Sequence, residues 1–209
     1  MVLQMNSAYD VKIGSANGLT DDVLGSLRGK VSLIVNIATK TNYIPKTSAI
    51  WSYTRTARQL WELQTVHNMY ENFSVVGVPC NQFGGQEPAN SEEIASFVAR
   101  AYPWVTFPIT EKVDVNGENE HPLFGFLKGT AKRISSDTRA DNSAEASQGH
   151  NLANQALHRV PHNYEKFLVD GSGRVIRRFS WGEFPLASER LTDQSTATIL
   201  EALNEVFGG

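Results

Sequence analysis

This 209-residue chain has a single cysteine, and it lies in a stretch that combines a strand-like run with turn residues and amide side chains. The stretch runs from Val75 to Pro88 and reads Val-Val-Gly-Val-Pro-Cys-Asn-Gln-Phe-Gly-Gly-Gln-Glu-Pro. Cys80 therefore follows an apolar, β-prone run and precedes two glycines and several amide side chains. Strand ends of this kind hold functional sites in α/β proteins. One cysteine excludes an intramolecular disulfide, a two-thiol redox couple within the chain and a multi-cysteine metal site.

Three histidines have a spacing that suggests metal binding at first sight. His158 and His162 are four residues apart, like a pair of ligands on a helix, and His150 lies upstream. Pro161 stands between the pair and disfavours a regular helix there, so the two rings have no reason to share a face. We expect no metal and no cofactor.

The first half of the chain has the pattern of a strand, a helix and a second strand. Residues Gly29 to Ala38 contain a nearly continuous Val/Ile/Leu run, which is typical of a central strand covered on both faces. From Trp51 to Tyr70 the apolar residues recur at three and four, which predicts a helix. Ser74 to Val78 is the next expected strand, and the three elements form a βαβ unit.

A second helix and a long excursion follow the central stretch. Asn90 stands where a helix N-cap belongs, with Glu93 three residues later and an apolar stripe that ends before Pro103. Residues 129–158 are rich in small and polar residues, and we interpret them as a long surface excursion.

The last part of the chain predicts a hairpin and a closing helix. Tyr164 to Val169 and Arg174 to Ser180 are β-prone runs that flank a Gly-rich connection. An amphipathic helix is expected near residues 199–207. The order β-α-β-α then β-β-α resembles the α/β thioredoxin-like fold, a mixed sheet flanked by helices with a helix inserted between the two halves.

Length and charge limit the classes of partner. We expect one domain over residues 1–209, which is long enough for a full hydrophobic core. The net charge of −3 and the scattered basic residues disfavour nucleic acids and anionic lipid surfaces. No apolar run approaches the roughly 20 residues of a membrane span, and no targeting segment is visible, so a cytoplasmic protein is the default expectation.

Four segments of the chain resemble the glutathione peroxidase family, in the order that the family has them. They are Pro79-Cys-Asn-Gln-Phe-Gly-Gly-Gln-Glu-Pro88, the strand Gly29-Lys-Val-Ser-Leu-Ile-Val-Asn-Ile-Ala38, the segment Val113 to Lys128 and the strand Asn163-Tyr-Glu-Lys-Phe-Leu-Val-Asp170. The resemblance implies reduction of hydroperoxides, in which a cysteine or selenocysteine thiolate attacks the O–O bond and is restored by a thiol.

Two positions that the resemblance places at the reacting centre are altered. In the stretch Asn36-Ile-Ala-Thr-Lys-Thr41, Thr41 stands where the family has its nucleophile, and a hydroxyl has no thiolate-like anion near neutral pH. His162 stands where the family has a tryptophan that supports the nucleophile. Gln86 and Asn163 match the family's remaining two positions. The resolving cysteine of the thioredoxin-dependent members, expected near Ala99, is also absent.

Cys80 and the two altered residues each have more than one interpretation. We favour Cys80 as a small, half-buried structural side chain over a catalytic or redox-sensing thiol. His162 either adds an acid/base group to the pocket or marks a site no longer used. Thr41 with His162 forms a nucleophile and base pair only if the two lie within hydrogen-bond reach. The sequence leaves the isomer of the bond between Val160 and Pro161 open.

The surroundings of the site also differ. Residues 45–53 resemble an insertion at the rim, and aromatic residues either line an apolar mouth there or serve oligomer contacts: Trp51, Trp61, Trp104, Tyr43 and Tyr53. The length of the stretch between Leu127 and His162 resembles the family's oligomeric forms and implies a homodimer or homotetramer.

Three functions follow from these residues. The favoured one is a repurposed enzyme that acts on a small, lipid- or hydroperoxide-derived molecule without thiol peroxidase chemistry, using Thr41, Gln86, His162 and Asn163. The others are a catalytically silent binding or structural homologue and residual thiol-dependent peroxide reduction through Cys80. The sequence leaves open whether the chain is an enzyme at all.

Overall fold

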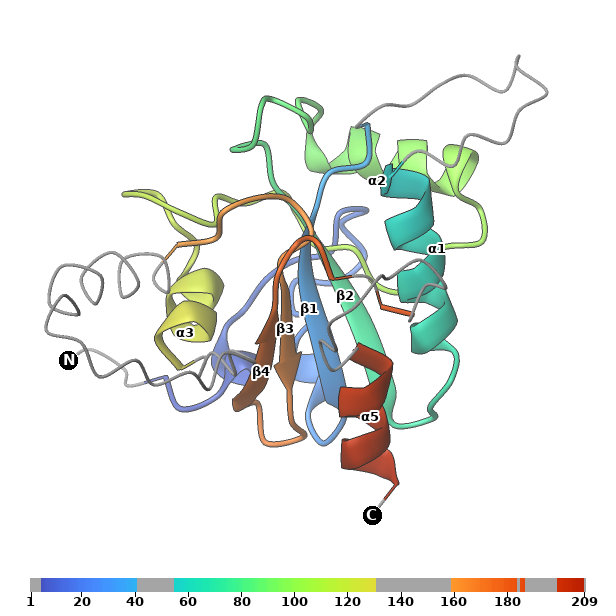
Figure 1. The fold of residues 1–209 in the computed structure, drawn as a ribbon. Coiled ribbons are helices and arrows are strands. Elements are labelled where there is room, and N and C mark those ends of the chain that lie inside the picture. The colour runs from blue at the N-terminus through green and yellow to red at the C-terminus, as the bar shows by residue number, and fades with distance from the viewer. Residues whose placement is uncertain (1–4, 41–54, 131–158, 184, 187–198, 209) are drawn as a thin grey trace, which may run out of the picture.

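A mixed four-stranded sheet is the centre of the fold, in the order β2-β1-β3-β4 (Figure 1). The computed structural model describes residues 5–40, 55–130, 159–183, 185–186 and 199–208. The strands are β1 (Val31–Ile37), β2 (Phe73–Pro79), β3 (Lys166–Val169) and β4 (Val175–Phe179). β1 runs parallel to β2 and antiparallel to β3, and β3 pairs antiparallel with β4.

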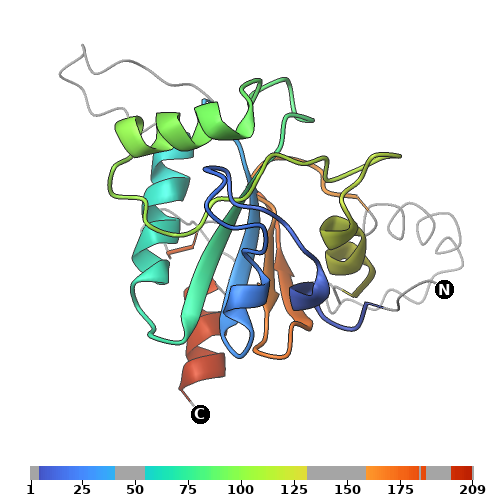
Figure 2. The same ribbon diagram turned by 180° about the vertical axis from the view of Figure 1, so that it is seen from behind.

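Helices lie on both faces of this sheet (Figures 1 and 2). The helices are η1 (Ala8–Asp10), η2 (Gly25–Leu27), α1 (Arg55–His67), α2 (Ser91–Ala101), α3 (Pro122–Thr130) and α5 (Ile199–Phe207). None of those described has the length and hydrophobicity that a transmembrane span requires.

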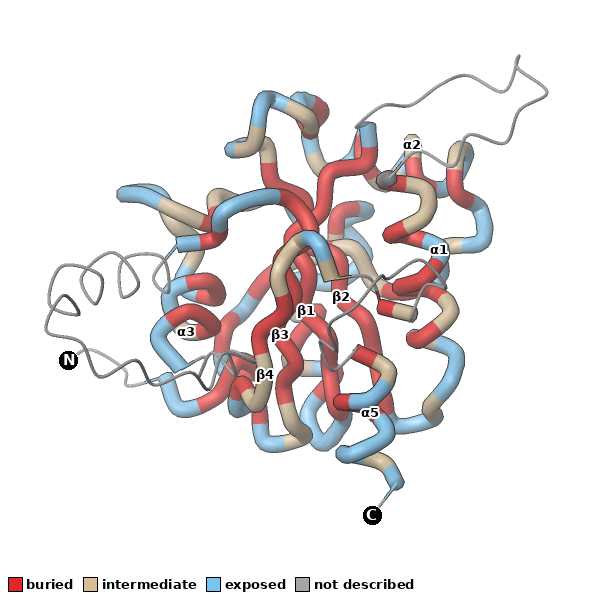
Figure 3. Tube along the Cα trace, viewed as in Figure 1, coloured by how far each residue is buried: buried red, intermediate tan, exposed pale blue. Residues whose placement is uncertain are grey.

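The core consists of two apolar layers separated by the sheet. Alternate residues of β1 point to opposite faces, so Leu33 packs in one layer with α1, α2 and α5, while Ile34 packs in the other with η1, η2 and α3. Every residue of β1 and β2 is buried, and the buried residues in Figure 3 concentrate on the strands. A continuous apolar run is the pattern that such doubly covered strands need.

The βαβ unit, the second helix and the hairpin expected from the sequence are confirmed. Asn90 caps α2 with a capping box, in which its side chain accepts from the Glu93 amide and the Glu93 carboxylate accepts from the Asn90 amide. The hairpin turns at Gly173, where φ is 85° and the amide donates to the Asp170 carbonyl at 2.8 Å.

The strands expected at Ser74 to Val78 and Arg174 to Ser180 differ by one residue at each end, and three other boundaries also differ from the expected ones. α1 ends at His67 rather than Tyr70, and the His67 Nδ1 accepts from the Val75 amide at 3.1 Å. β3 begins at Lys166 rather than Tyr164, because Tyr164 adopts a left-handed φ of 69° that no strand residue has. The excursion expected at residues 129–158 does not begin at 129, because residues 129 and 130 are the last turn of α3; residues 131–158 lie outside the described residues.

Candidate functional site

The candidate site lies where β1 and β2 end side by side. Because the two strands are parallel, with Ile37 paired to Pro79, the segments that follow them leave the sheet at the same edge. The Cys80 amide donates to the Ile37 carbonyl at 3.0 Å, and the Thr39 amide donates to the Glu87 carboxylate. The segment after β1 is therefore fixed against the central motif.

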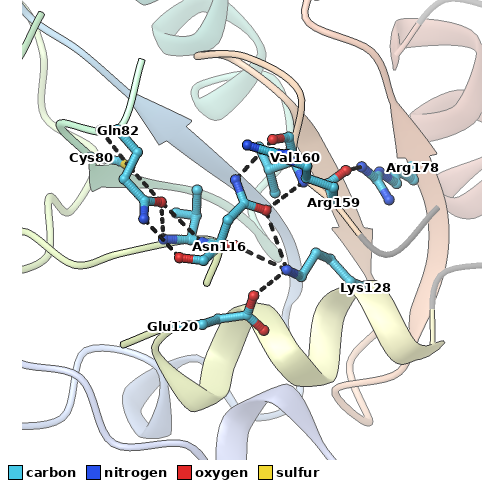
Figure 4. Close-up of polar contacts among 9 residues, drawn as sticks. Cys80, Gln82, Asn116, Glu120, Lys128, Arg159, Val160 and Arg178 are labelled. Carbon is cyan, nitrogen blue, oxygen red and sulfur yellow. Dashed lines mark hydrogen bonds and ion pairs between the residues drawn. The ribbon is translucent and has the colours of Figure 1, made fainter. Parts of the chain in front are cut away.

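Cys80 lies under this motif, away from solvent. Its exposed fraction is 0%, and its Sγ accepts from the Gln82 amide at 3.5 Å (Figure 4). Burial raises the pKa of the Cys80 thiol, because a thiolate is poorly stabilised without water. Its position fits the structural interpretation, although the side chain is completely buried where the sequence suggested half-buried.

Gln86 and Asn163 meet across the site. The Asn163 Nδ2 donates to the Gln86 Oε1 at 2.8 Å, although the two residues are 77 positions apart in sequence. Asn163 is 2% exposed, and its Oδ1 has no hydrogen-bond partner. Since Gln86 Oε1 already accepts this bond, its Nε2 is the end of the amide that can donate to a ligand.

His162 is exposed, precedes Asn163 of this amide pair, and has two aromatic rings as neighbours. Its ring stacks on Phe83 with centroids 5.9 Å apart and planes at 22°, and lies 5.2 Å from Trp181 at 37°. Sequence reasoning named His162 but missed both neighbours. Phe83 belongs to the central motif, whereas Trp181 carries no signal beyond its position directly after a strand.

Hydrogen bonds from Lys166 and Gln59 hold the turn that carries Trp181. The buried Lys166 donates through Nζ to the Tyr164 and Glu183 carbonyls, both at 2.7 Å, which ties the turn after β4 to the start of β3. From α1, the Gln59 Nε2 donates to the Trp181 carbonyl at 3.2 Å. The turn that carries Trp181 is thus held by hydrogen bonds from two other segments, β3 and α1.

A second polar network fixes the chain that leads into His162 (Figure 4). The Asn116 Nδ2 donates to the Val160 carbonyl at 2.9 Å, and the Val160 amide donates to the Asn116 Oδ1 at 2.8 Å. Gln82 in turn accepts from the Asn116 amide at 3.0 Å. The Val160–Pro161 bond is trans, which settles the isomer that the sequence left open.

Glu87 is the buried carboxylate of the site. Its side chain is 0% exposed, and Oε1 has no hydrogen-bond partner while Oε2 accepts from Thr39. Burial raises the pKa of Glu87, and the hydrogen bond from Thr39 opposes this effect without cancelling it. Sequence reasoning did not single out this residue.

Several predicted residues lie outside the described residues. Thr41 is one of them, so its pairing with His162 stays a prediction, and the same holds for His150, His158, Trp51, Tyr43 and Tyr53. Trp61 and Trp104 are 49% and 37% exposed. Two hollows lie near the site, one of about 630 Å³ beside Lys40, Phe97 and Arg100 and one of about 310 Å³ beside Asn81, Lys112 and His121. Neither is lined by Gln86, His162 or Asn163.

Comparison with known proteins identifies clear relatives. The glutathione peroxidase family profile matches residues 8–128. Glutathione peroxidase-like peroxiredoxin HYR1 of Saccharomyces cerevisiae is 40% identical over 156 residues, covering 74% of this chain and 75% of that protein. Hydroperoxy fatty acid reductase gpx1 of Synechocystis is 37% identical over 169 residues, covering 79% and 83%. The crystal structure of Trgpx in apo form aligns with a TM-score of 0.54 at 28% identity, covering 87% and 89%, and confirms the thioredoxin-like fold.

Proposed function

We propose that this chain, which belongs to the glutathione peroxidase family, has lost thiol-dependent peroxide reduction and uses the same face for other chemistry on a small molecule. The observation that carries the proposal is the state of its one thiol. Cys80 is completely buried and its pKa is raised, so it lacks the accessible thiolate that attack on a peroxide requires.

The groups available for other chemistry are the Gln86–Asn163 pair and His162. An imidazole both takes up and releases protons in the physiological pH range, whereas an indole only donates a hydrogen bond. The exposed His162 ring stands beside an amide pair joined at 2.8 Å. We propose that the amide pair orients a polar group of the ligand and that His162 exchanges a proton with it. Thr41 lies outside the described residues and is kept in the proposal as the hydroxyl group that the family resemblance assigns to the reacting centre.

The aromatic rings around His162 support an apolar ligand. The ring centroids of Phe83 and Trp181 lie 5.9 and 5.2 Å from the imidazole centroid. The two rings offer flat apolar surface to a hydrocarbon chain. One relative is named a hydroperoxy fatty acid reductase, which makes the same substrate class reasonable for this chain. We therefore propose a lipid- or hydroperoxide-derived small molecule as the substrate class.

Peroxidase assays test the loss of the ancestral reaction. The purified chain is incubated with hydrogen peroxide or linoleic acid hydroperoxide, and with glutathione or reduced thioredoxin as the thiol. We expect no turnover above the uncatalysed rate, and the same result for Cys80→Ser. Turnover that Cys80→Ser abolishes would overturn the proposal.

Restoring the nucleophile provides the positive control. Thr41→Cys combined with His162→Trp returns the two altered positions to the family pattern, and we expect this double variant to gain peroxide reduction. The gain should fall when Gln86→Ala is added, because the glutamine then no longer supports the thiolate.

A silent binding homologue is the second candidate, favoured by one observation. Asn163 is almost fully buried, with an exposed fraction of 2%, which limits its contact with a substrate. Incubation with hydroxy and hydroperoxy linoleic acid, followed by mass spectrometry, separates the candidates. Conversion that His162→Ala abolishes supports the enzyme, whereas binding without conversion supports the silent homologue. We also propose a homodimer or homotetramer, which light scattering after gel filtration would measure.

A further inference from the structure

The bend that carries His162 and Asn163 interrupts the ladder between β1 and β3. Paired residues run from Ser32 opposite Val169 to Val35 opposite Lys166, so the next pair would be Asn36 opposite Glu165. Instead the Asn36 carbonyl accepts from the Tyr164 amide at 2.7 Å, while the Asn36 amide donates to the Glu165 carbonyl at 3.3 Å. Two residues therefore oppose one, which is the arrangement of a β-bulge.

Tyr164 holds an unusual backbone conformation at this bulge. Its φ of 69° is the only positive φ of a non-glycine residue in the described part of the chain. The left-handed region is unfavourable for a residue with a side chain, because its Cβ then crowds the following carbonyl oxygen. Such a conformation persists only where neighbouring contacts fix it, and one of them is the Tyr164 hydroxyl, which donates to the Ala38 carbonyl at 2.9 Å.

The side chain of Asn36 supplies the contacts on both sides of the bulge. It is 0% exposed, its Oδ1 accepts from the Glu165 amide at 3.0 Å, and its Nδ2 donates to the His162 carbonyl at 3.0 Å. The first bond satisfies the amide that lost its ladder partner. The second fixes the residue whose ring faces the site. An amide is the side chain that offers an acceptor and a donor in this geometry.

We infer that Asn36 is a positioning residue, which fixes His162 and Asn163 at the site by clamping both flanks of the bulge. Its side chain is completely buried and acts on the site through its bonds to the backbone at His162 and Glu165. The inference deepens the proposed function, because it names what holds the proposed proton-exchanging residue. Its test reads the position of side chains and needs no activity, so it stands or fails separately from the proposed function.

Asn36→Asp is the sharpest variant. It keeps an oxygen for the Glu165 amide but turns the Nδ2 donor into an acceptor opposite the His162 carbonyl. Ser32→Ala is the matched control, because Ser32 lies in the same strand, is equally buried, and its hydroxyl accepts from Tyr9 at 3.0 Å, far from His162 in the ladder. Asn36→Ala, which removes both bonds without a buried charge, is the second variant if Asn36→Asp does not fold.

The readouts are the His162 ring resonances, the Asn163 side-chain amide resonance and the emission of Trp181. Emission is measured in a background in which Trp51, Trp61 and Trp104 are replaced by Phe, so that Trp181 is the only emitter. We expect the Asn36 variant to shift all three signals, because His162 moves relative to Trp181. Ser32→Ala should lower the unfolding midpoint and leave the signals unchanged.

Two results would overturn the inference. One is an Asn36 variant that loses stability like Ser32→Ala and keeps the His162, Asn163 and Trp181 signals of the parent. The other needs no variant: the Glu165 amide of the unmodified chain should exchange its hydrogen as slowly as the ladder amides of β3, and exchange at the rate of open loops would show that Asn36 does not hold it.

Discussion

Replacing Glu165 by Gln is expected to lower the free energy of unfolding by about 3–5 kcal/mol. Glu165 and Arg178 form an ion pair whose side chains are each 1% exposed, with Oε1 and Nε 2.7 Å apart. Arg178 also donates through Nη2 to the Arg159 carbonyl at 2.7 Å (Figure 4). The replacement removes the carboxylate that balances the buried guanidinium charge, and the loss of this ion pair produces the cost.

The size of the effect makes it measurable. Domains are typically stable by about 5–15 kcal/mol, so the loss is a large fraction of the total. For a chain of this length each kcal/mol moves the melting temperature by about 2–4 °C, which predicts a fall of about 6–20 °C. Urea unfolding followed by circular dichroism gives the free energy directly, provided that the slope with urea is unchanged.

Glu205→Gln is the matched control. Glu205 pairs with Arg177 at 3.0 Å, but its side chain is 64% exposed, and exposed pairs contribute about 1 kcal/mol or less. The double replacement Glu165→Leu with Arg178→Met should recover much of the lost stability, because neither charge then remains buried. A loss for Glu165→Gln no larger than that for Glu205→Gln would refute the reasoning.

Three further predictions concern the thiol, a buried carboxylate and a turn. Cys80 should react with a thiol reagent only as fast as the chain opens, so denaturant should accelerate the reaction strongly; rapid labelling in buffer would contradict its burial. Burial raises the pKa of Glu87 above its unfolded value of about 4.3. The protonated Glu87 side chain therefore contributes its full stability below about pH 4.3, and this contribution is lost as the pH rises through the raised pKa. Glu87→Gln should flatten the pH dependence of the free energy of unfolding in urea between the unfolded and the raised pKa of Glu87. An unchanged pH dependence would refute this assignment. Gly173→Ala should lower the free energy of unfolding more than Gly117→Ala, since φ is positive at both but only at Gly173 would the new Cβ clash with a neighbour, the Ser7 side chain; equal urea midpoints would disprove the clash.

The elements with the strongest patterns were predicted from the sequence. β1 and β2 are apolar because both faces are covered, and the helix cap at Asn90 depends on two side chains three residues apart. Family membership followed from motifs around Cys80 and Asn163. These features are local in sequence, so they can be recognised without knowing which distant segments meet.

The features that the sequence did not predict depend on contacts between distant segments. The bulge at Tyr164 has no glycine to mark it, and the residue that supports it, Asn36, lies 126 positions before His162. A lone Asn in an apolar strand does carry one general signal, because a buried amide needs partners. The sequence did not predict Trp181 as a neighbour of His162, because their contact depends on the turn that Lys166 holds through the Glu183 carbonyl.

The long-range origin of the site also determines when it forms during folding. Gln86 belongs to the first βαβ half, whereas Asn163 and His162 arrive only when β3 pairs with β1. Contacts of such large sequence separation close slowly, so an early intermediate would contain the central motif without the site. The layer that buries Cys80 includes Val160, Phe167 and Val175 from the second half, and the thiol should therefore stay open to labelling until that half docks. Loss of thiol labelling during refolding would then report the moment at which the site is assembled.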